Sequence, residues 1–445
     1  MLRSLLHLPA RRAAIASCLA LPLAGSPSVH SAELAEQAAA CRKLVADRFL
    51  PYWHDTTIDR EHGGYLLADD AVKGRSRPDE KQLVSQARVV WAFSLAHRKG
   101  FSTPERNYLD AAAHGARFLR ERMRDPQHGG YFWSVGIDGQ LRDPHKRLYG
   151  EAFVIYALVE FHRAGGGREP LDDALQLHRE IQQHAHDDQH GGWTEHFRRD
   201  WTPLPLRDPA GLVEVAGYKS ANTHLHLMEA LTELHAVTRD PAVKESLLEA
   251  LELNRRYFYP ADPSRAAFHF QPDWSPVTDP RSAGLSYGHN IEFAWLMIHA
   301  EESLGLAPSW DHFFKHLDHT LLHGTDHQRG GIYERGAGNN PADDTDKVWW
   351  VQAEGLAALT DALCRSPLRD LAGEAGSKAR APYLLALQQL LAFTDTHLRD
   401  PKTGVWIDTV TADGTPKGHG LAHSWKANYH DLRAFLKFIE AFGQE

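Results

Sequence analysis

Cysteine is scarce in this sequence, and its scarcity excludes a fold held together by disulfides. The 445 residues include 3 Cys and 4 Met, against 29 His. Once an N-terminal leader is set aside, only Cys41 and Cys364 remain, which leaves room for one bridge and no disulfide framework. Hydrophobic residues make up 42% of the chain, so we expect a globular protein with a sizeable core.

Several motifs that hold cofactors or metals are also missing. The sequence has no P-loop, no HExxH, no cysteine cluster and no GxGxxG following a strand. Two His-x-His pairs occur, at 184/186 and 224/226, but side chains two residues apart on a helix point in different directions. We therefore expect neither a cofactor nor a required metal.

The chain also has no excess of positive charge. Lys and Arg number 49 against 58 Asp and Glu, a net charge of −9. This balance argues against nucleic acid or an anionic membrane surface as a partner. No segment after the leader is apolar enough to span a bilayer. We expect a small-molecule partner, no nucleic acid, no membrane span, and a monomer or weak homodimer.

Residues 1–31 are typical of a secretory signal peptide. Three arginines accompany an apolar run over residues 13–25, and small residues follow. Cleavage is expected near Ser31 or Ala32, which would place the mature protein in the periplasm or outside the cell. The arginine pair at 11 and 12 leaves a twin-arginine route open.

A turn motif recurs six times along the remaining chain. The copies begin at Asp59, Asp125, Asp187, Asp262, Asp326 and Asp400. In the fullest copies an aspartate is followed by two glycines and an aromatic residue, as in "DREHGGY". Aspartate favours the start of a turn and glycine supplies positive φ.

Between these turns the sequence repeats apolar residues at three-to-four spacing, as in residues 82–100, which predicts helices. Six units of two helices and a turn, 62–75 residues apart, predict one all-α domain over residues 32–445. The absence of an obvious polar cap favours closure into an (α/α)6 barrel. An open solenoid is the alternative.

Polar side chains share faces on several of the predicted helices. The sets are Lys219, Asn222, His226 and Glu229; His289 and Glu292; Trp350 and Glu354; His430 and Arg433; and Arg88 with Trp91. Each set alone fits a hydrogen-bonded core residue or ordinary packing. Together they favour a wet cavity on the barrel axis, because burying so many ionisable groups costs several kcal/mol unless they are paired or solvated. Tryptophan walls with polar donors and acceptors suit a sugar.

Ordered motifs connect the chain to a known family. "SQARVVWAFS", "KSANTHLHLMEA", "SYGHNIEFAWLM", "WWVQAEG" and "WKANYHDLR" occur in this order across the mature sequence. The sequence thereby resembles the acylglucosamine 2-epimerase superfamily, and within it the cellobiose 2-epimerases. The resemblance implies an (α/α)6 barrel, in agreement with the repeat count.

The resemblance also implies catalytic roles. His289 and His430 would be general acid/base residues on opposite sides of the sugar C2, and His226 would assist ring opening. Arg88 would stabilise the enediolate oxygen, and Glu292 would orient or tune His289. Imidazole titrates near ~6.5, so it can both accept and donate a proton near neutrality.

Five further residues would line the sugar site by the same resemblance: Asn222, Trp350, Glu354, Arg433 and Tyr149. The expected substrate is an unphosphorylated β-1,4-linked disaccharide, epimerised at its reducing-end C2. Mannose-type aldose–ketose isomerases and acylglucosamine 2-epimerases remain alternatives, since return of the proton to C1 would give a ketose. "WKANYH" departs from the cellobiose epimerases at Ala427 and Asn428, which puts the substrate preference in doubt. A glycoside hydrolase using Glu292 and Glu354 is the alternative from another class.

Overall fold

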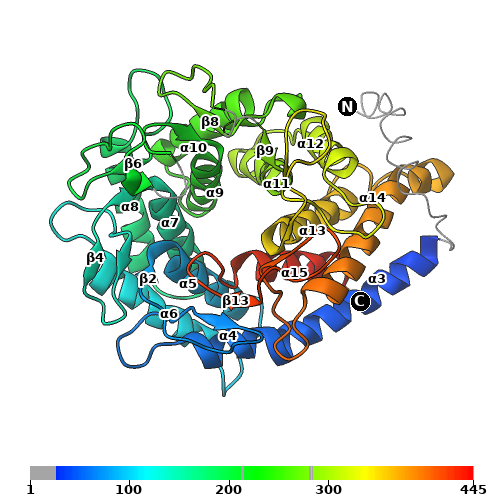
Figure 1. Cartoon of the computed structure of the whole chain (residues 1–445), viewed down its shortest axis with the longest axis horizontal. Helices are drawn as coiled ribbons and strands as arrows, with labels where there is room; N and C mark the ends of the chain where they lie inside the picture. The colour runs from blue at the N-terminus through cyan, green and yellow to red at the C-terminus, as the bar shows by residue number, and fades with distance from the viewer. Residues whose placement is uncertain (1–26, 212–214, 280–281, 283, 444–445) are drawn as a thin grey trace.

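The computed structural model describes residues 27–211, 215–279, 282 and 284–443. Within these residues, helices form two concentric rings around one axis (Figure 1). The inner helices are α5 (Leu83–Arg98), α7 (Leu148–Arg163), α9 (Ala221–Thr238), α11 (Tyr287–Leu304), α13 (Trp349–Cys364) and α15 (Tyr429–Phe442). The outer helices are α3 (Pro27–Leu44), α6 (Tyr108–Phe118), α8 (Glu169–His184), α10 (Pro241–Leu253), α12 (Trp310–His323) and α14 (Gly373–Phe393).

Shorter helical segments complete the outer ring. Four outer helices run into a π-helical turn, at η1 (Val45–Phe49), η2 (Leu119–Met123), η4 (Asn254–Phe258) and η7 (Thr394–Leu398). The remaining segments are α4 (Leu50–Thr57) and the 3-10 turns η3 (Pro209–Gly211) and η5 (Pro263–Arg265).

The inner ring is closed. Each inner helix contacts the next one, and α15 contacts α5. Every inner helix also packs on one outer helix, and the partner of α15 is α3 from the other end of the chain. The predicted (α/α)6 barrel is therefore confirmed, and the open solenoid is wrong.

The inner helices are buried on nearly all sides. In α5 every residue from Leu83 to Ala96 is buried, polar ones included. A helix surrounded by others needs apolar contacts around its whole circumference. The polar residues of the inner helices therefore stand out as exceptions to a packed core.

Short strands join the loops at one end of the barrel. They are β1 (Asp69–Asp70), β2 (Lys81–Gln82), β3 (Ser134–Val135), β4 (Leu141–Asp143), β5 (Lys146–Arg147), β6 (His196–Phe197), β7 (Lys219–Ser220), β8 (His269–Phe270), β9 (Leu285–Ser286), β10 (Arg335–Gly336), β11 (Lys347–Val348), β12 (Thr409–Val410) and β13 (Gly420–Ala422). A strand just before an inner helix pairs antiparallel with one from the following unit, as β2 does with β3 and β7 with β8. The sixth pair, β1 with β13, joins the two ends of the chain.

Five of the six recurring turns have the predicted glycine at positive φ, and the exception is the turn at Asp262, which has no glycine. At the first, the Asp59 carboxylate accepts hydrogen bonds from the backbone N–H groups of Glu61 and His62. Gly63 and Gly64 follow at φ of +81° and +68°. A Cβ on Gly64 would stand 2.6 Å from the side-chain oxygen of Gln86, so the position requires glycine.

Buried lysines bind four of these turns. Lys81, Lys146, Lys219 and Lys347 each begin a two-residue strand, and each donates to the turn aspartate of its own unit. The expectation that Lys219 shares the polar face of α9 is therefore wrong. Its ammonium lies 2.8 Å from Asp187 and also donates to two backbone carbonyls.

Three further expectations concern the ends and surface of the chain. Cys41 and Cys364 are both free, so the possible bridge does not form. Among the described residues, no helix is both long and apolar enough to cross a bilayer. Most of the predicted signal peptide lies outside the described residues, and α3 begins at Pro27, ahead of the expected cleavage site.

Candidate active site

A cavity of about 220 Å³ opens where the inner helices begin. Its lining residues are Arg88, Tyr149, Asn222, His226, His289, Glu292, Trp349, Trp350, Trp425 and His430. The volume is below the ~300–1,000 Å³ of pockets for drug-sized ligands, so it suits a single sugar ring. Eight of the ten predicted site residues line this cavity. The other two, Glu354 and Arg433, lie behind its wall and contact the lining residues.

His289 comes from the first turn of α11 and keeps one face on the cavity. Its Nε2 lies 3.2 Å from Oδ1 of Asn222 on α9. Enclosure, reinforced by the nearby His226 and His430, lowers the pKa of His289 to about 3. The imidazole is therefore neutral near pH 7 and able to accept a proton.

His430 faces the same cavity from the first turn of α15. Its Nδ1 lies 2.7 Å from Oε1 of Glu354, so Nε2 is the nitrogen left for a substrate. Burial outweighs the neighbouring carboxylate and lowers the pKa of His430 to about 3. The two imidazoles thus reach one cavity from α11 and α15, on either side of α13, and Trp350 of α13 contacts both rings.

His226 lies on α9 beside a carboxylate of its own helix. Its Nδ1 is 2.8 Å from Oε2 of Glu229, and its Nε2 is 4.0 Å from Oε2 of Glu292. Burial lowers its pKa below the ordinary value. The expected role of Glu292 as a partner of His289 differs from this geometry, since Glu292 faces His226.

Arg88 on α5 supplies a cation to the cavity wall. One guanidinium nitrogen donates to the Tyr149 hydroxyl at 2.8 Å and the other to the Trp425 carbonyl at 3.1 Å. The guanidinium carbon lies 4.3 Å from the centre of the Phe153 ring. The Arg88 charge is held in place by neutral groups, so it stays available to an oxyanion.

Behind the cavity, Arg433 binds three glutamates from three different helices. One of its terminal nitrogens donates to Glu292 at 2.6 Å and to Glu354 at 2.7 Å, and the other donates to Glu229. The Tyr429 hydroxyl adds a hydrogen bond to Glu229 at 2.6 Å. Three carboxylates share one guanidinium, so they do not all ionise with equal ease.

The pKa values of these carboxylates diverge accordingly. Burial and the neighbouring Glu354 raise the pKa of Glu292 well above its ordinary value. For Glu229 and Glu354, burial alone would raise the pKa, but Arg433 and the hydrogen-bonded His226 or His430 together lower it to about 2. Glu292 therefore holds a proton near neutrality while the other two are anions.

One set of side chains here could in principle hold a metal. Ligand atoms of Glu292, Glu354 and His430 lie within 4.8 Å of one another. Arg433 already donates to both carboxylates, and its positive charge would repel a cation placed between them. The donor set therefore fits an arginine-centred ion cluster better than a metal site.

Sequence reasoning missed four contributors to this site, one of which is Trp425 in the cavity lining. Trp349 lines the cavity beside Trp350, and the adjacent tryptophans in "WWVQAEG" could have indicated it. Glu229 was placed on the polar face but not in the site, although its i, i+3 spacing from His226 was visible. Tyr429 sits next to His430, and its bond to Glu229 joins residues 200 positions apart.

Comparisons with known proteins identify the family of this chain. A family model described as N-acylglucosamine 2-epimerase matches residues 63–434. The cellobiose 2-epimerase of Bacteroides fragilis is 29% identical over 412 residues, covering 89% of this chain and 97% of the relative. The D-mannose isomerase of Marinomonas mediterranea is 24% identical over 409 residues, covering 88% of this chain and 95% of the relative.

A solved structure extends the likeness to three dimensions. The cellobiose 2-epimerase from Spirochaeta thermophila matches with a TM-score of 0.78 at 29% identity, covering 95% of this chain and 99% of the other. The family model and these relatives span nearly the whole barrel, including all the helices that build the cavity. The chain belongs to the N-acylglucosamine 2-epimerase family.

Proposed function

We propose that this protein is a sugar 2-epimerase that acts at the reducing-end C2 of an unphosphorylated β-1,4-linked disaccharide. The observation that carries the proposal is a pair of neutral imidazoles, His289 and His430, on one small cavity. Removing a C2 proton from one face of a sugar and returning it on the other requires two such groups.

The remaining residues fit the steps of this reaction. His226, polarised by the Glu229 anion, assists ring opening, which exposes the C1 carbonyl. One imidazole then removes the C2 proton, and the Arg88 guanidinium stabilises the negative charge that develops on the enediolate oxygen. The other imidazole, after taking up a proton from water in the open cavity, gives it to the opposite face of C2, and the first imidazole releases the proton taken from C2 to water. Glu292 keeps a proton inside the site, near His226, for these transfers.

The charge of the cavity supports an unphosphorylated substrate. Arg433 is neutralised by its carboxylates and lies behind the wall, so Arg88 is the cation that faces the sugar. Three tryptophans, Trp349, Trp350 and Trp425, offer apolar ring faces to a sugar. The names of the relatives from Bacteroides fragilis and Spirochaeta thermophila support cellobiose as the first substrate to test.

From the N-terminal leader we also propose that the enzyme is exported from the cytoplasm. Export would bring the enzyme to oligosaccharides released outside the cytoplasm, which suits a disaccharide better than a phosphorylated intermediate.

An aldose–ketose isomerase is the second candidate. The same two imidazoles would return the proton to C1, and the relative from Marinomonas mediterranea is named as a mannose isomerase. A glycoside hydrolase is disfavoured by geometry. Glu292 and Glu354 are both bonded to one nitrogen of Arg433, at 2.6 and 2.7 Å, and do not stand free on either side of a glycosidic bond.

One experiment separates these functions. The mature protein is incubated with cellobiose in D2O and C2 is followed by NMR. We expect deuterium at C2 and a product with mannose at the reducing end. A ketose product would favour the isomerase, and free glucose the hydrolase. No change in the sugar would contradict all three.

A histidine variant tests the assignment of the acid/base pair. His430→Ala should slow deuterium exchange at C2 by about 10²–10⁴-fold, the usual contribution of a general acid or base. Lys402→Ala, at an exposed position far from the cavity, is the matched control and should leave exchange unchanged. Full exchange in the histidine variant would rule out His430 as one of the two bases.

A further inference from the structure

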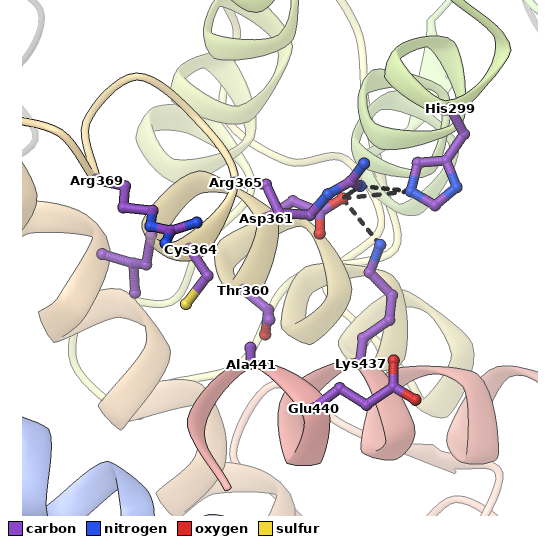
Figure 2. A pocket seen from close by; sticks show the side chains of 10 residues that line it. His299, Thr360, Asp361, Cys364, Arg365, Arg369, Lys437, Glu440 and Ala441 are labelled. Carbon is purple, nitrogen blue, oxygen red and sulfur yellow. Dashed lines mark hydrogen bonds and ion pairs between the residues drawn. The ribbon is translucent and has the colours of Figure 1, made fainter. Parts of the chain in front are cut away.

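A second cavity, of about 520 Å³, lies near the C-terminal ends of three inner helices (Figure 2). These helices are α11, α13 and α15, which carry His289, Glu354 and His430 in their first two turns. Asp361 of α13 and Lys437 of α15 are among the residues that line the cavity. Asp361 follows Glu354, and Lys437 follows His430, by seven residues, or about two helical turns. The ion pairs of this cavity therefore lie on the same helices as the acid/base machinery.

An aspartate fixes the position of the Lys437 ammonium. Oδ2 of Asp361 accepts hydrogen bonds from Lys437 at 2.8 Å and from Arg365 at 3.0 Å (Figure 2). Burial would raise the pKa of Asp361, but Lys437, His299 and Arg365 together hold it below its usual range. The carboxylate is therefore ionised. It anchors the positive charge of α15 to α13.

The same ammonium contacts a buried tryptophan of α11. The Lys437 Nζ lies 4.2 Å from the centre of the Trp295 ring, and the guanidinium carbon of Arg433 lies 4.6 Å from it. Residues four apart share a helix face, so the indole lies across one face of α15. A desolvated cation is attracted to the face of an indole. Lys437 therefore helps to hold the Trp295 ring in one orientation.

That orientation sets the position of a catalytic partner. The indole N–H of Trp295 donates to Oε2 of Glu354 at 3.0 Å, and no other group of the described residues donates a hydrogen bond to this oxygen. The other oxygen, Oε1, meets Nδ1 of His430 and a nitrogen of Arg433, each at 2.7 Å. An ionised carboxylate only accepts, so Nδ1 of His430 carries the proton. A turn of the indole would rotate the carboxylate and disturb this contact.

A plain helix-to-helix ion pair needs no such tryptophan. At the same end of the barrel, Arg163 of α7 pairs with Glu233 of α9 and lies 3.7 Å from Glu160. Among the described residues, Arg163 has no cation–π contact with an aromatic ring. Lys437 differs because its contacts lead, through one ring and one carboxylate, to an imidazole of the sugar cavity.

We propose that Lys437 is a positioning residue for His430. Anchored by Asp361, it holds the Trp295 ring, whose N–H holds the Glu354 carboxylate that orients the imidazole. The proposal rests on the proposed function, in which His430 is one of the two acid/base residues.

Steady-state kinetics with cellobiose test this role. Lys437→Met removes the charge and keeps an unbranched side chain. We expect kcat to fall about 2–30-fold, the range for substitutions along a coupled network, with KM little changed. Lys437→Arg keeps the cation and should recover most of kcat. Arg163→Met is the matched control, which should lower the Tm to a similar extent but leave kcat unchanged.

A double variant shows whether the lysine acts through the carboxylate. In a Glu354→Gln background, Lys437→Met should cost little more in kcat, because the anion that it positions is already gone. Should Lys437→Met not fold, Lys437→Gln keeps a donor to Asp361 and still removes the charge. An equal fall in both backgrounds, or a parental kcat in Lys437→Met, would overturn the proposal.

Proton NMR tests the same link without a substrate. The Nδ1 proton of His430, shared with an ionised carboxylate, should give a downfield signal that is lost in His430→Ala. We expect this signal to shift or broaden in Lys437→Met and to stay in place in Arg163→Met. If the parent leaves cellobiose unchanged, the proposed function fails, but this proton still tests the positioning role. An unmoved signal in Lys437→Met would contradict it.

Discussion

The contact between His430 and Glu354 fixes which imidazole nitrogen meets the substrate. The carboxylate accepts from Nδ1 and also balances Arg433, although it does not line the cavity itself. Glu354→Gln keeps the shape but removes the charge. We expect kcat to fall about 10–100-fold, as for other carboxylates that orient a functional histidine, with little change in KM.

A pH profile distinguishes this positioning role from a purely structural one. Without the anion the pKa of His430 should fall further, so the acid limb of kcat should move to lower pH. Glu245→Gln, at an exposed position on α10, is the control and should change nothing. An increased KM at unchanged kcat would instead place Glu354 in contact with the sugar.

The lowered pKa values of His289 and His430 predict how activity depends on pH. A histidine acts as a base when neutral, and both imidazoles have a pKa of about 3 instead of 6.5. Activity should therefore persist as the pH falls below 6.5, with the acid inflection of kcat/KM well under that value. Initial rates with cellobiose between pH 4 and 8 measure the inflection. An inflection at 6.5 or above would contradict the burial of the pair.

The sequence predicted which residues meet at the site better than it predicted their partners. Motifs on five helices placed His289, His430 and Arg88 on one cavity, as found. The i, i+3 spacing suggested that Glu292 holds His289, yet Glu292 turns to Arg433, 141 residues away. Spacing along one helix indicates a shared face, but it carries no information on what a neighbouring helix presents to that face.

At the level of elements, four units have a buried lysine just before the inner helix, and this lysine brace joins the short strand to the turn by an ion pair with the turn aspartate. The fourth unit replaces it with Leu285, and its turn at Asp262 lacks the glycine pair. Sequence analysis found the turns, because aspartate and glycine mark them, but not the strands. Two-residue strands such as β11 are too short to show an alternating pattern.

Removing one brace should destabilise the barrel locally. Lys347 is fully buried and donates to Asp326 at 2.9 Å and to the Ala412 carbonyl at 2.9 Å. Lys347→Met removes both bonds and leaves a carboxylate without its cation, so we expect a loss of about 2 kcal/mol in unfolding free energy. The urea midpoint, compared with that of Lys402→Met, measures it.

A double variant tests whether the loss comes from the pair. Adding Asp326→Asn to Lys347→Met removes the stranded charge, so the double variant should be less destabilised than the sum of the single variants. Strict additivity would show that the lysine acts through its packing alone.

For the molecule as a whole, the many buried histidines predict loss of stability in acid. Eleven described histidines have lowered pKa values, chiefly because burial disfavours the charged ring: His114, His178, His226, His235, His289, His299, His312, His316, His327, His423 and His430. Between pH 6.5 and about 4 these histidines bind protons in the unfolded chain but stay neutral in the folded protein. Each such histidine then costs up to about 1.4 kcal/mol per pH unit as the pH falls.

Some acids oppose this trend without reversing it. Burial raises the pKa of Glu151 and of Glu334 from 4.5 to about 7. The stability that each gains from being protonated in the folded protein is fully present below pH 4.5 and is lost as the pH rises through 7. Histidines outnumber such acids, so the apparent Tm should fall steadily from pH 6.5 to 4 in calorimetry. His178→Gln should reduce the slope, and His190→Gln, at an exposed position, should not. A Tm that rises over this range would contradict the prediction.

The partner of the last inner helix is the first outer one, and this has a consequence for how the protein is made. Leu34 and Ala38 of α3 are buried in the finished ring, where α3 packs on α15. During synthesis α3 is made before the other described helices and α15 after them. The apolar face of α3 therefore stays without its partner helix until nearly the whole chain has been synthesised. Bringing two such distant segments together carries a large loop-closure cost, which slows the step. We therefore expect completion of the ring to be a late event of folding, and a chain that ends before α15 should expose this apolar face and aggregate.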